Sequence, residues 1–333
     1  KTVTVSDDST GSTETSFSYT NVGTARLSLD QPYECKNGGS DSCDVVFADT
    51  GFRFFEDIET NPIPTQISAK PSSTLNIQAI KKNDDTGSCQ AAFIDTRTIE
   101  MSATCVDPIA CAGSQVAIKA LNNITNLDTL NDGSMLTYKP VELNFGDDTQ
   151  SAAEFVFTYP DAGKVQLHAR YNIPDENGAP SGNFMLGSSD DFVVRPFGFY
   201  IDVVDNPKAQ TAGGDIFIAA GESFVTTLKA VQWQADNDTD LSDNAVTKNF
   251  GNEEDAEIAE VIPNMVFPNL TTLPVSGVLG TLSDVIFDTF SSGDVDEKGI
   301  ATNTDMTYSE VGIISIEANL KDKSYLGADD VIG

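Results

Sequence analysis

Four aspartates at short intervals form the strongest candidate for a ligand site in this chain of 333 residues. Asp236, Asp238 and Asp240 occupy alternate positions, and Asp243 follows three residues later. Calcium prefers several oxygen ligands from one tight loop, and alternate side chains can turn inward on a single ion. The Gly and Glu that an EF-hand loop carries at its sixth and twelfth places are absent here. The spacing therefore indicates either a calcium site or a solvated acidic loop, and both interpretations stay open.

The cysteines are a second set of residues that could do chemistry. All of them lie in the first third of the chain: Cys35, Cys43, Cys89, Cys105 and Cys111. Because the chain has only one histidine, they make a poor zinc set, and disulfides formed in an oxidising compartment are the better interpretation. The close spacing of Cys35 and Cys43 favours a bond between them. The other three cysteines would share one bond and one spare thiol, in a pairing that the sequence leaves open.

Catalytic chemistry finds little support among the residue types. The single histidine, His168, stands between Leu167 and Ala169 in a strand pattern, so we expect it to face solvent and not to activate a nucleophile. Carboxylates are so plentiful, with 51 acidic residues, that a glycosidase pair could be drawn almost anywhere. The sequence predicts no catalytic residue, and a polysaccharide hydrolase is the least favoured function.

Three copies of one pattern indicate the elements that carry these residues. Each copy has a Tyr, three residues, a Gly, and then small or apolar residues at every second position. The Tyr and Gly pairs are Tyr19 with Gly23, Tyr159 with Gly163, and Tyr308 with Gly312. Alternation predicts strands with one buried face, and Gly can adopt backbone conformations that other residues resist. We expect each copy to be a hairpin of strand, tight turn and strand.

Other landmarks repeat in step with this pattern and predict a tandem array. Residues 69–80 resemble residues 220–231, and residues 186–193 resemble residues 326–332. The expected fold is all β, as tandem Ig-like antiparallel β-sandwiches. Residues 1–50 would be the C-terminal part of a preceding β domain, 51–197 one complete sandwich, and 198–333 another whose last strand is missing. A short helix is expected around residues 252–261, where acidic residues suit a helix N-terminus.

The composition excludes several classes of partner. The formal net charge is −32 and is spread along the chain, which disfavours nucleic acid and anionic membrane surfaces. No stretch approaches the ~20 apolar residues of a membrane span. The only tryptophan, Trp233, follows a strand pattern and is expected to pack in a core, although an aromatic platform for sugars is the alternative.

Short segments along the whole chain resemble one known family. They include Tyr-Pro-Asp-Ala-Gly at 159–163 and Phe-Val-Val-Arg-Pro-Phe-Gly-Phe at 192–199, together with residues 43–54, 86–89, 105–111, 241–244, 247–251, 308–314 and 325–327. These segments resemble the C-terminal region of MshQ-like proteins, from the biogenesis cluster of the mannose-sensitive haemagglutinin (MSHA) type IV pilus. Lys248 departs from the family pattern, which leads us to expect Pro there.

The resemblance implies an exported or cell-surface protein of a Gram-negative bacterium, linked to pilus assembly or adhesion. It carries over no catalytic residue. We expect a non-enzymatic stalk that displays or anchors an adhesive module, with pilus components or other copies of the chain as partners. A carbohydrate-binding module that recognises surface glycans is the first alternative, and the hydrolase is the second. No cofactor is expected beyond calcium at the acidic loop.

Overall fold

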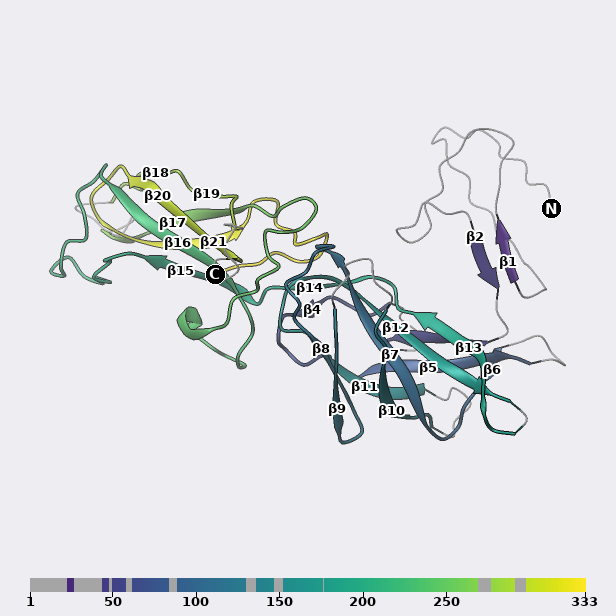
Figure 1. Cartoon of the computed structure of the whole chain (residues 1–333). Helices are drawn as coiled ribbons and strands as arrows, with labels where there is room; N and C mark the ends of the chain where they lie inside the picture. Colours follow the sequence, from purple (N-terminus) through teal and green to yellow (C-terminus); the bar gives the residue numbers. More distant parts are fainter. Residues whose placement is uncertain are drawn as a thin grey trace, which may run out of the picture.

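Nearly every element of the chain is a β-strand. A computed structural model describes residues 23–26, 44–47, 50–57, 62–83, 89–129, 136–146, 152–175, 177–268, 277–290 and 298–333. Within them the single helical element is η1 (Leu241–Asp243), a short 3-10 turn. Strands β1 (Gly23–Arg26) and β2 (Asp44–Phe47) pair with each other, and the remaining strands form two sandwiches that lie end to end (Figure 1). The all-β expectation is confirmed. No helix in this described part has the length and apolar character of a membrane span.

The first sandwich packs two large sheets face to face. One has the order β10-β7-β12-β14-β4, with β13 also paired to β12. Its strands are β4 (Gln66–Ile67), β7 (Thr96–Asp107), β10 (Lys139–Asn144), β12 (Gly163–Pro174), β13 (Pro180–Ser188) and β14 (Phe192–Arg195). The other has the order β3-β5-β11-β8-β9, with β6 paired to β5. Its strands are β3 (Thr50–Phe55), β5 (Leu75–Lys82), β6 (Cys89–Ala91), β8 (Val116–Ala120), β9 (Asn123–Leu127) and β11 (Ala152–Thr158).

The second sandwich is smaller but repeats the same plan. Its sheets have the orders β15-β16-β20-β18 and β19-β17-β21. The strands are β15 (Gly198–Val203), β16 (Ser223–Val231), β17 (Ala259–Phe267), β18 (Leu282–Ser283), β19 (Ile286–Phe287), β20 (Ile300–Tyr308) and β21 (Ile313–Leu320). The run β15-β16-β20 matches β3-β5-β11, and β19-β17-β21 matches β10-β7-β12. Equal neighbours in equal order are what a tandem copy of one domain produces.

The recurring Tyr and Gly pattern is not a hairpin, and this part of the prediction is wrong. Tyr159 follows β11 in one sheet, whereas Gly163 opens β12 in the facing sheet. In the same way Tyr308 ends β20 in one sheet, and Gly312 directly precedes β21 in the other. The turn is an arch that carries the chain across the core. Alternation shows that a strand has one buried face, but it does not show whether the next strand pairs beside it or packs opposite. In the first copy, Gly23 opens β1, and Tyr19 lies outside the described residues.

Both arches require glycine. Gly163 has φ +130° and Gly312 has φ +155°, values that residues with a side chain rarely adopt. A Cβ at Gly163 would overlap the carbonyl oxygen of Asp107, and one at Gly312 would overlap that of Phe267. The turn is therefore pressed against the backbone of a neighbouring strand in each sandwich.

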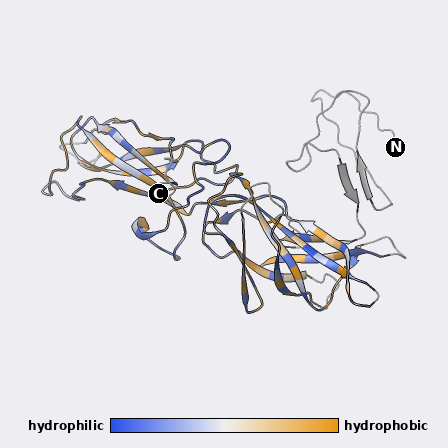
Figure 2. Cartoon of the chain, in the orientation of Figure 1, coloured by the Kyte–Doolittle hydropathy of each residue, from blue (hydrophilic) through white to orange (hydrophobic). Residues whose placement is uncertain are grey.

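Each sandwich buries one face of its strands in a core of its own. Along β5, Leu75, Ile77 and Ala79 are buried while their neighbours are more exposed. Figure 2 shows the result as alternating hydrophobic and hydrophilic bands along the strands. Burial of a large apolar side chain contributes about 1.5–3 kcal/mol, so this alternation supplies the main stabilisation of both domains.

Two further expectations need correction. Residues 252–258 form no helix, and β17 begins at Ala259. The match of residues 186–193 with 326–332 is also out of register. In the structure Ala169 pairs with Gly187, and the equivalent Ala318 exchanges both backbone hydrogen bonds with Gly333, at 2.7 and 2.9 Å. The segment that ends at Gly333 therefore corresponds to β13, because backbone pairing defines equivalence more strictly than a short Leu-Gly match.

Candidate functional site: the junction between the sandwiches

The acidic loop does not bring its carboxylates together. Asp238 Oδ1 accepts a hydrogen bond from the Asp240 N–H at 3.1 Å, and Asp240 Oδ1 accepts from the N–H and hydroxyl of Ser242. The bonds from Ser242 lower the pKa of Asp240. Asp236 pairs instead with Lys70 of the first sandwich at 3.1 Å. No group of three or more His, Cys, Asp or Glu in the described part is arranged to hold a metal ion. Calcium binding stays a prediction.

Among the cysteines, the structure joins Cys105 to Cys111 and leaves Cys89 free and exposed. Cys35 and Cys43, for which we favoured a bond, lie outside the described residues. His168 lies on β12 with its ring nitrogens 3.0 Å from the Thr104 hydroxyl and 2.8 Å from that of Ser188. Burial lowers its pKa. Both ring nitrogens thus lie within hydrogen-bond distance of hydroxyl groups on the neighbouring strands β7 and β13, and the side chain is half-buried, so the expectation that it faces solvent is met only in part.

The polar residues that do converge lie where the two sandwiches meet. Only Pro196 and Phe197 separate β14 from β15, and the Phe197 N–H donates to the carbonyl of Val231 at 2.8 Å. Ala162 of the first arch packs into the core of the second sandwich. A linker of this length, together with a shared core residue, restricts how far one domain can turn against the other.

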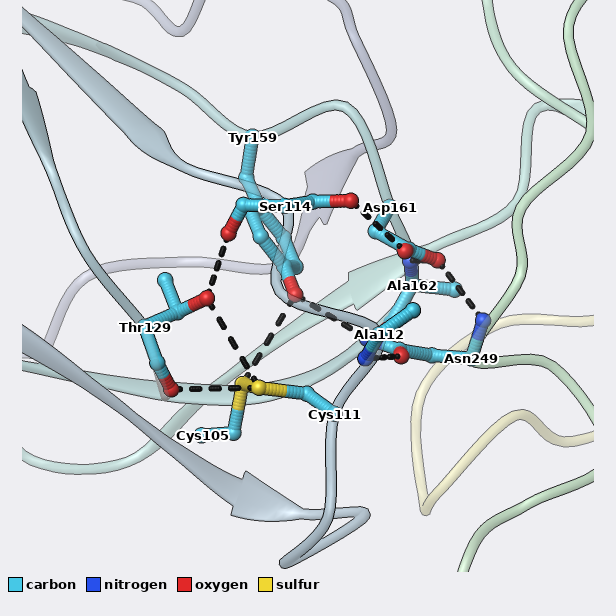
Figure 3. The surroundings of a disulfide bond; sticks show 9 residues. All are labelled: Cys105, Cys111, Ala112, Ser114, Thr129, Tyr159, Asp161, Ala162 and Asn249. Carbon is cyan, nitrogen blue, oxygen red and sulfur yellow. Dashed lines mark hydrogen bonds between the residues drawn. A yellow bond between two sulfur atoms is a disulfide. The ribbon is translucent and has the colours of Figure 1, made fainter. Parts of the chain in front are cut away.

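Asn249 is the centre of this junction (Figure 3). It comes from the second sandwich, yet its side chain is only 2% exposed and reaches into the end of the first. Its Nδ2 donates to the Tyr159 hydroxyl at 2.9 Å and to the Ala162 carbonyl at 3.0 Å, and its Oδ1 accepts from the Ala112 N–H at 2.7 Å. Its own N–H donates to Asp161 Oδ1 at 2.9 Å. Every polar group of this side chain is thus bonded to the other domain.

The disulfide positions the loop that meets Asn249. Cys105 lies near the end of β7, and its bond to Cys111 holds residues 106–110 in a closed loop directly before Ala112. Thr129 donates its hydroxyl proton to the Ser114 carbonyl, and the Ser114 hydroxyl donates to Asp161 Oδ2 at 3.0 Å. The loop is therefore fixed on both sides of the contact with the second sandwich.

Asp161 is a buried carboxyl within this network, only 1% exposed. Removal from water raises its pKa from 3.8 to about 6, although hydrogen bonds from the Asn249 N–H, the Ala162 N–H and the Ser114 hydroxyl oppose the shift. A buried charge is costly unless donors surround it. The proton of this one group therefore couples the junction to pH.

Two further acids with raised pKa values lie in the second sandwich. Glu253 is 5% exposed and accepts a hydrogen bond from the Tyr325 hydroxyl at 2.8 Å. Glu257 accepts from the Leu326 N–H at 3.0 Å. Burial raises the pKa of each carboxyl to about 7. Both belong to the segment for which a helix was expected, and they anchor it to the end of the chain instead.

Further polar contacts surround the centre of the junction. Gln232 Nε2 donates to the Pro160 carbonyl at 2.7 Å, and the Glu254 N–H donates to Asp107 Oδ1 at 2.9 Å. The backbone N–H of Trp233 donates to the Ser68 carbonyl at 3.0 Å, and the indole ring of Trp233 lies 5.7 Å from the Lys70 ammonium. Trp233 is thus half-buried at the junction and is not one of the fully buried core residues. The alternative of an aromatic platform for sugars stays a prediction.

Sequence reasoning missed the junction residues Asn249, Asp161 and Ser114. The arch pattern alone could not have found Asp161, because Glu310 holds the equivalent position in the second arch and is exposed. The arrangement can hold two rigid bodies at one angle.

The fold and this junction define the chain as a tandem Ig-like β-sandwich protein. Residues 32–188 match the family model described as a domain of unknown function (DUF6701), first Ig-like domain, and residues 195–304 match the model of the second DUF6701 domain. Together the two consecutive matches span most of the sequence, and the chain belongs to the DUF6701 family.

Other comparisons add little. No curated protein matches the chain. Among solved structures it is similar to a DUF4466 family protein from Parabacteroides merdae ATCC 43184, at 10% identity over 86% of this chain and 97% of that chain. The TM-score is 0.25, which is too low to indicate a shared fold.

Proposed function

We propose that the chain is a non-enzymatic structural segment, a rigid spacer within an exported, adhesin-like surface protein. The observation that carries this proposal is the insertion of Asn249 into the first sandwich, where all its polar groups are bonded. Two domains joined by a loose linker would not need such a buried contact, because relative motion is the default between small domains. A spacer that holds a module at a fixed position does need a buried contact between its domains.

Two observations support the location and the partners. A disulfide bond fits an oxidising compartment, and the charge of −32 keeps an exposed rod soluble and separate from anionic surfaces. The sequence resemblance to MshQ-like proteins points to the surface of a Gram-negative bacterium and to pilus components as partners. The spacer would hold an adhesive module away from the cell.

The rigidity of the junction is testable by residual dipolar couplings in solution. In the unaltered chain, couplings from both sandwiches should fit one alignment tensor. Asn249→Ala removes the side-chain hydrogen bonds to the Ala112 N–H, the Ala162 carbonyl and the Tyr159 hydroxyl, at about 1–3 kcal/mol for each buried group left unsatisfied. Two different tensors are then expected. Asn126→Ala on the exposed face of β9 is the matched control, and independent tensors in the unaltered chain would overturn the spacer.

The surface role has a separate test in cells. Antibody against the chain should label intact bacteria, and mild shearing of pili should release it with the pilin. Confinement to the cytoplasm would contradict the exported role, and surface labelling without co-purification would restrict the proposal to a spacer unconnected with pili.

A further inference from the structure

The disulfide bond lies at the end of the first sandwich that faces the second. Cys105 is close to the end of β7 in one sheet, and Cys111 belongs to residues 108–115, which cross to β8 in the facing sheet. Figure 3 shows the two sulfur atoms beside Tyr159 and near Asn249 of the second sandwich. The bond spans only six residues of the sequence. It therefore holds one crossing segment in place and does not join distant parts of the chain.

Each half of the disulfide contacts or adjoins a group that binds Asn249. Cys105 Sγ lies 3.7 Å from the Tyr159 hydroxyl, and this hydroxyl accepts the hydrogen bond from Asn249 Nδ2 at 2.9 Å. Cys111 directly precedes Ala112, whose N–H donates to Asn249 Oδ1 at 2.7 Å. The positions of the two bonded cysteines thus determine where two partners of Asn249 lie.

The loop that the disulfide closes meets the second sandwich at another point as well. Asp107 lies within this loop, and its Oδ1 accepts a hydrogen bond from the Glu254 N–H at 2.9 Å. At the other end of the loop, Cys111 Sγ lies 3.1 Å from the Thr129 carbonyl oxygen. The second sandwich therefore contacts the chain before and after Cys111, and both contacts depend on the course of this loop.

The fold of the first sandwich has other supports than this bond. Strand β7 pairs with β10 on one side and with β12 on the other, where Cys105 is opposite Val165. Neither cysteine belongs to the cluster of apolar residues that forms the core of this domain. Two sulfur atoms cannot stay at covalent distance once the bond between them is broken. Reduction should therefore move the loop beneath Asn249 and leave the paired strands and the core in place.

We propose that the disulfide between Cys105 and Cys111 is an oxidation-controlled lock on the junction. The two sandwiches turn against each other while both cysteines are thiols, and they are held at one angle once the bond forms. This proposal rests on the spacer function and adds the condition under which the spacer becomes rigid. Bond formation removes two electrons and two protons from the thiols, and the acceptor is a disulfide oxidant, such as an oxidised thiol–disulfide oxidoreductase, that leaves as a dithiol. Because an oxidising compartment supplies such oxidants, the junction becomes rigid after export.

Removal of this one bond is the first test. In the double variant Cys105→Ser, Cys111→Ser, residual dipolar couplings from the two sandwiches should require two alignment tensors. Hydrogen exchange at the amide of Ala112 should accelerate at least tenfold, whereas exchange at Ile77, in the middle of β5, should be unchanged. A single tensor in the double variant would overturn the lock and leave the spacer standing. Two tensors in the oxidised, unaltered chain would overturn the spacer, and the lock with it.

Reduction of the unaltered chain is the second test, and it also serves if the double variant does not fold. Dithiothreitol should produce the same two tensors, and reoxidation should restore one. In the double variant dithiothreitol should change nothing, which separates this bond from the other cysteines of the chain. In an Asn249→Ala background, loss of the bond should not accelerate exchange at Ala112 further, because the contact that it supports is already gone. An equal acceleration in that background, or unfolding of the first sandwich on reduction, would contradict the proposal.

Discussion

The two sandwiches share a strand order but differ in how their equivalent edges end. In the first, β14 closes the edge of β12, and the residues beneath it are fully buried. In the second, pairing reaches only Ala318, and the residues beyond it line a groove. The comparison teaches that burial on a sandwich face depends on the neighbouring strand as much as on the residue types, because isoleucine on β21 is no less apolar than valine on β12.

Substitution of the two arch glycines should have the largest effect on stability and therefore tests this comparison first. Gly163→Ala would force a Cβ onto the carbonyl of Asp107 at positive φ. We expect a loss on the order of 4 kcal/mol in the free energy of unfolding of the first sandwich. Gly312→Ala meets Phe267 in the same way but lies at an open edge that can shift, so its cost should be smaller. Denaturant unfolding measures both, and equal losses would contradict the role given to the covering strand.

The pH dependence of the free energy of unfolding should distinguish Asp161 at the junction from Glu253 within the second sandwich. A carboxyl whose pKa rises on folding stabilises the folded state below its unfolded pKa, and this stabilisation disappears as pH rises through the folded pKa. For Asp161, between 3.8 and about 6, the loss is about 3 kcal/mol across that interval. Stability should therefore fall from pH 4 to pH 7, and Asp161→Asn should remove part of the slope.

Two further variants sharpen the pH experiment. Glu253→Gln should remove a different part of the slope, at higher pH, because the pKa of Glu253 rises to about 7. Asp175→Asn alters an exposed turn residue and should leave the slope unchanged. Thermal melts over this pH range supply the data, and an unaltered slope in Asp161→Asn would refute the assignment.

The two tyrosines of the arches should differ in a graded way. Tyr159→Phe removes the acceptor of a buried bond from Asn249 and should cost about 1–3 kcal/mol. Tyr308→Phe removes a bond from the Gly280 N–H at 2.8 Å in a partly exposed place, where water can replace the hydroxyl. Its cost should be under about 1 kcal/mol. The reverse order, measured by urea unfolding, would show that the junction is not the more tightly bonded arch.

The smallest effect is expected at the acidic loop. If Asp236, Asp238, Asp240 and Asp243 bind calcium, a chelator should lower the melting temperature by a few degrees. Asp238→Ala should abolish that change, while Asp175→Asn should preserve it. An identical melting curve with and without chelator would remove calcium from consideration.

The short-range sequence pattern determined the secondary structure and the domain class of this protein. Alternation in β5, β12 and β16 predicted strands with one buried face, and glycine at 163 and 312 marked the turns, because backbone and burial preferences act over a few residues. The repeated order of these landmarks was enough to predict all-β tandem domains of the Ig-like class.

Only the tertiary structure decided which strands meet. The same alternation fits a hairpin and an arch, and a Leu-Gly match placed residues 326–332 out of register, since neither pattern encodes the pairing partner. Asn249 and Asp161 became site residues because two domains bury them against each other, which is a property of contacts between distant segments. For the same reason, the groove beside β21 depends on a strand order that no short stretch of sequence contains.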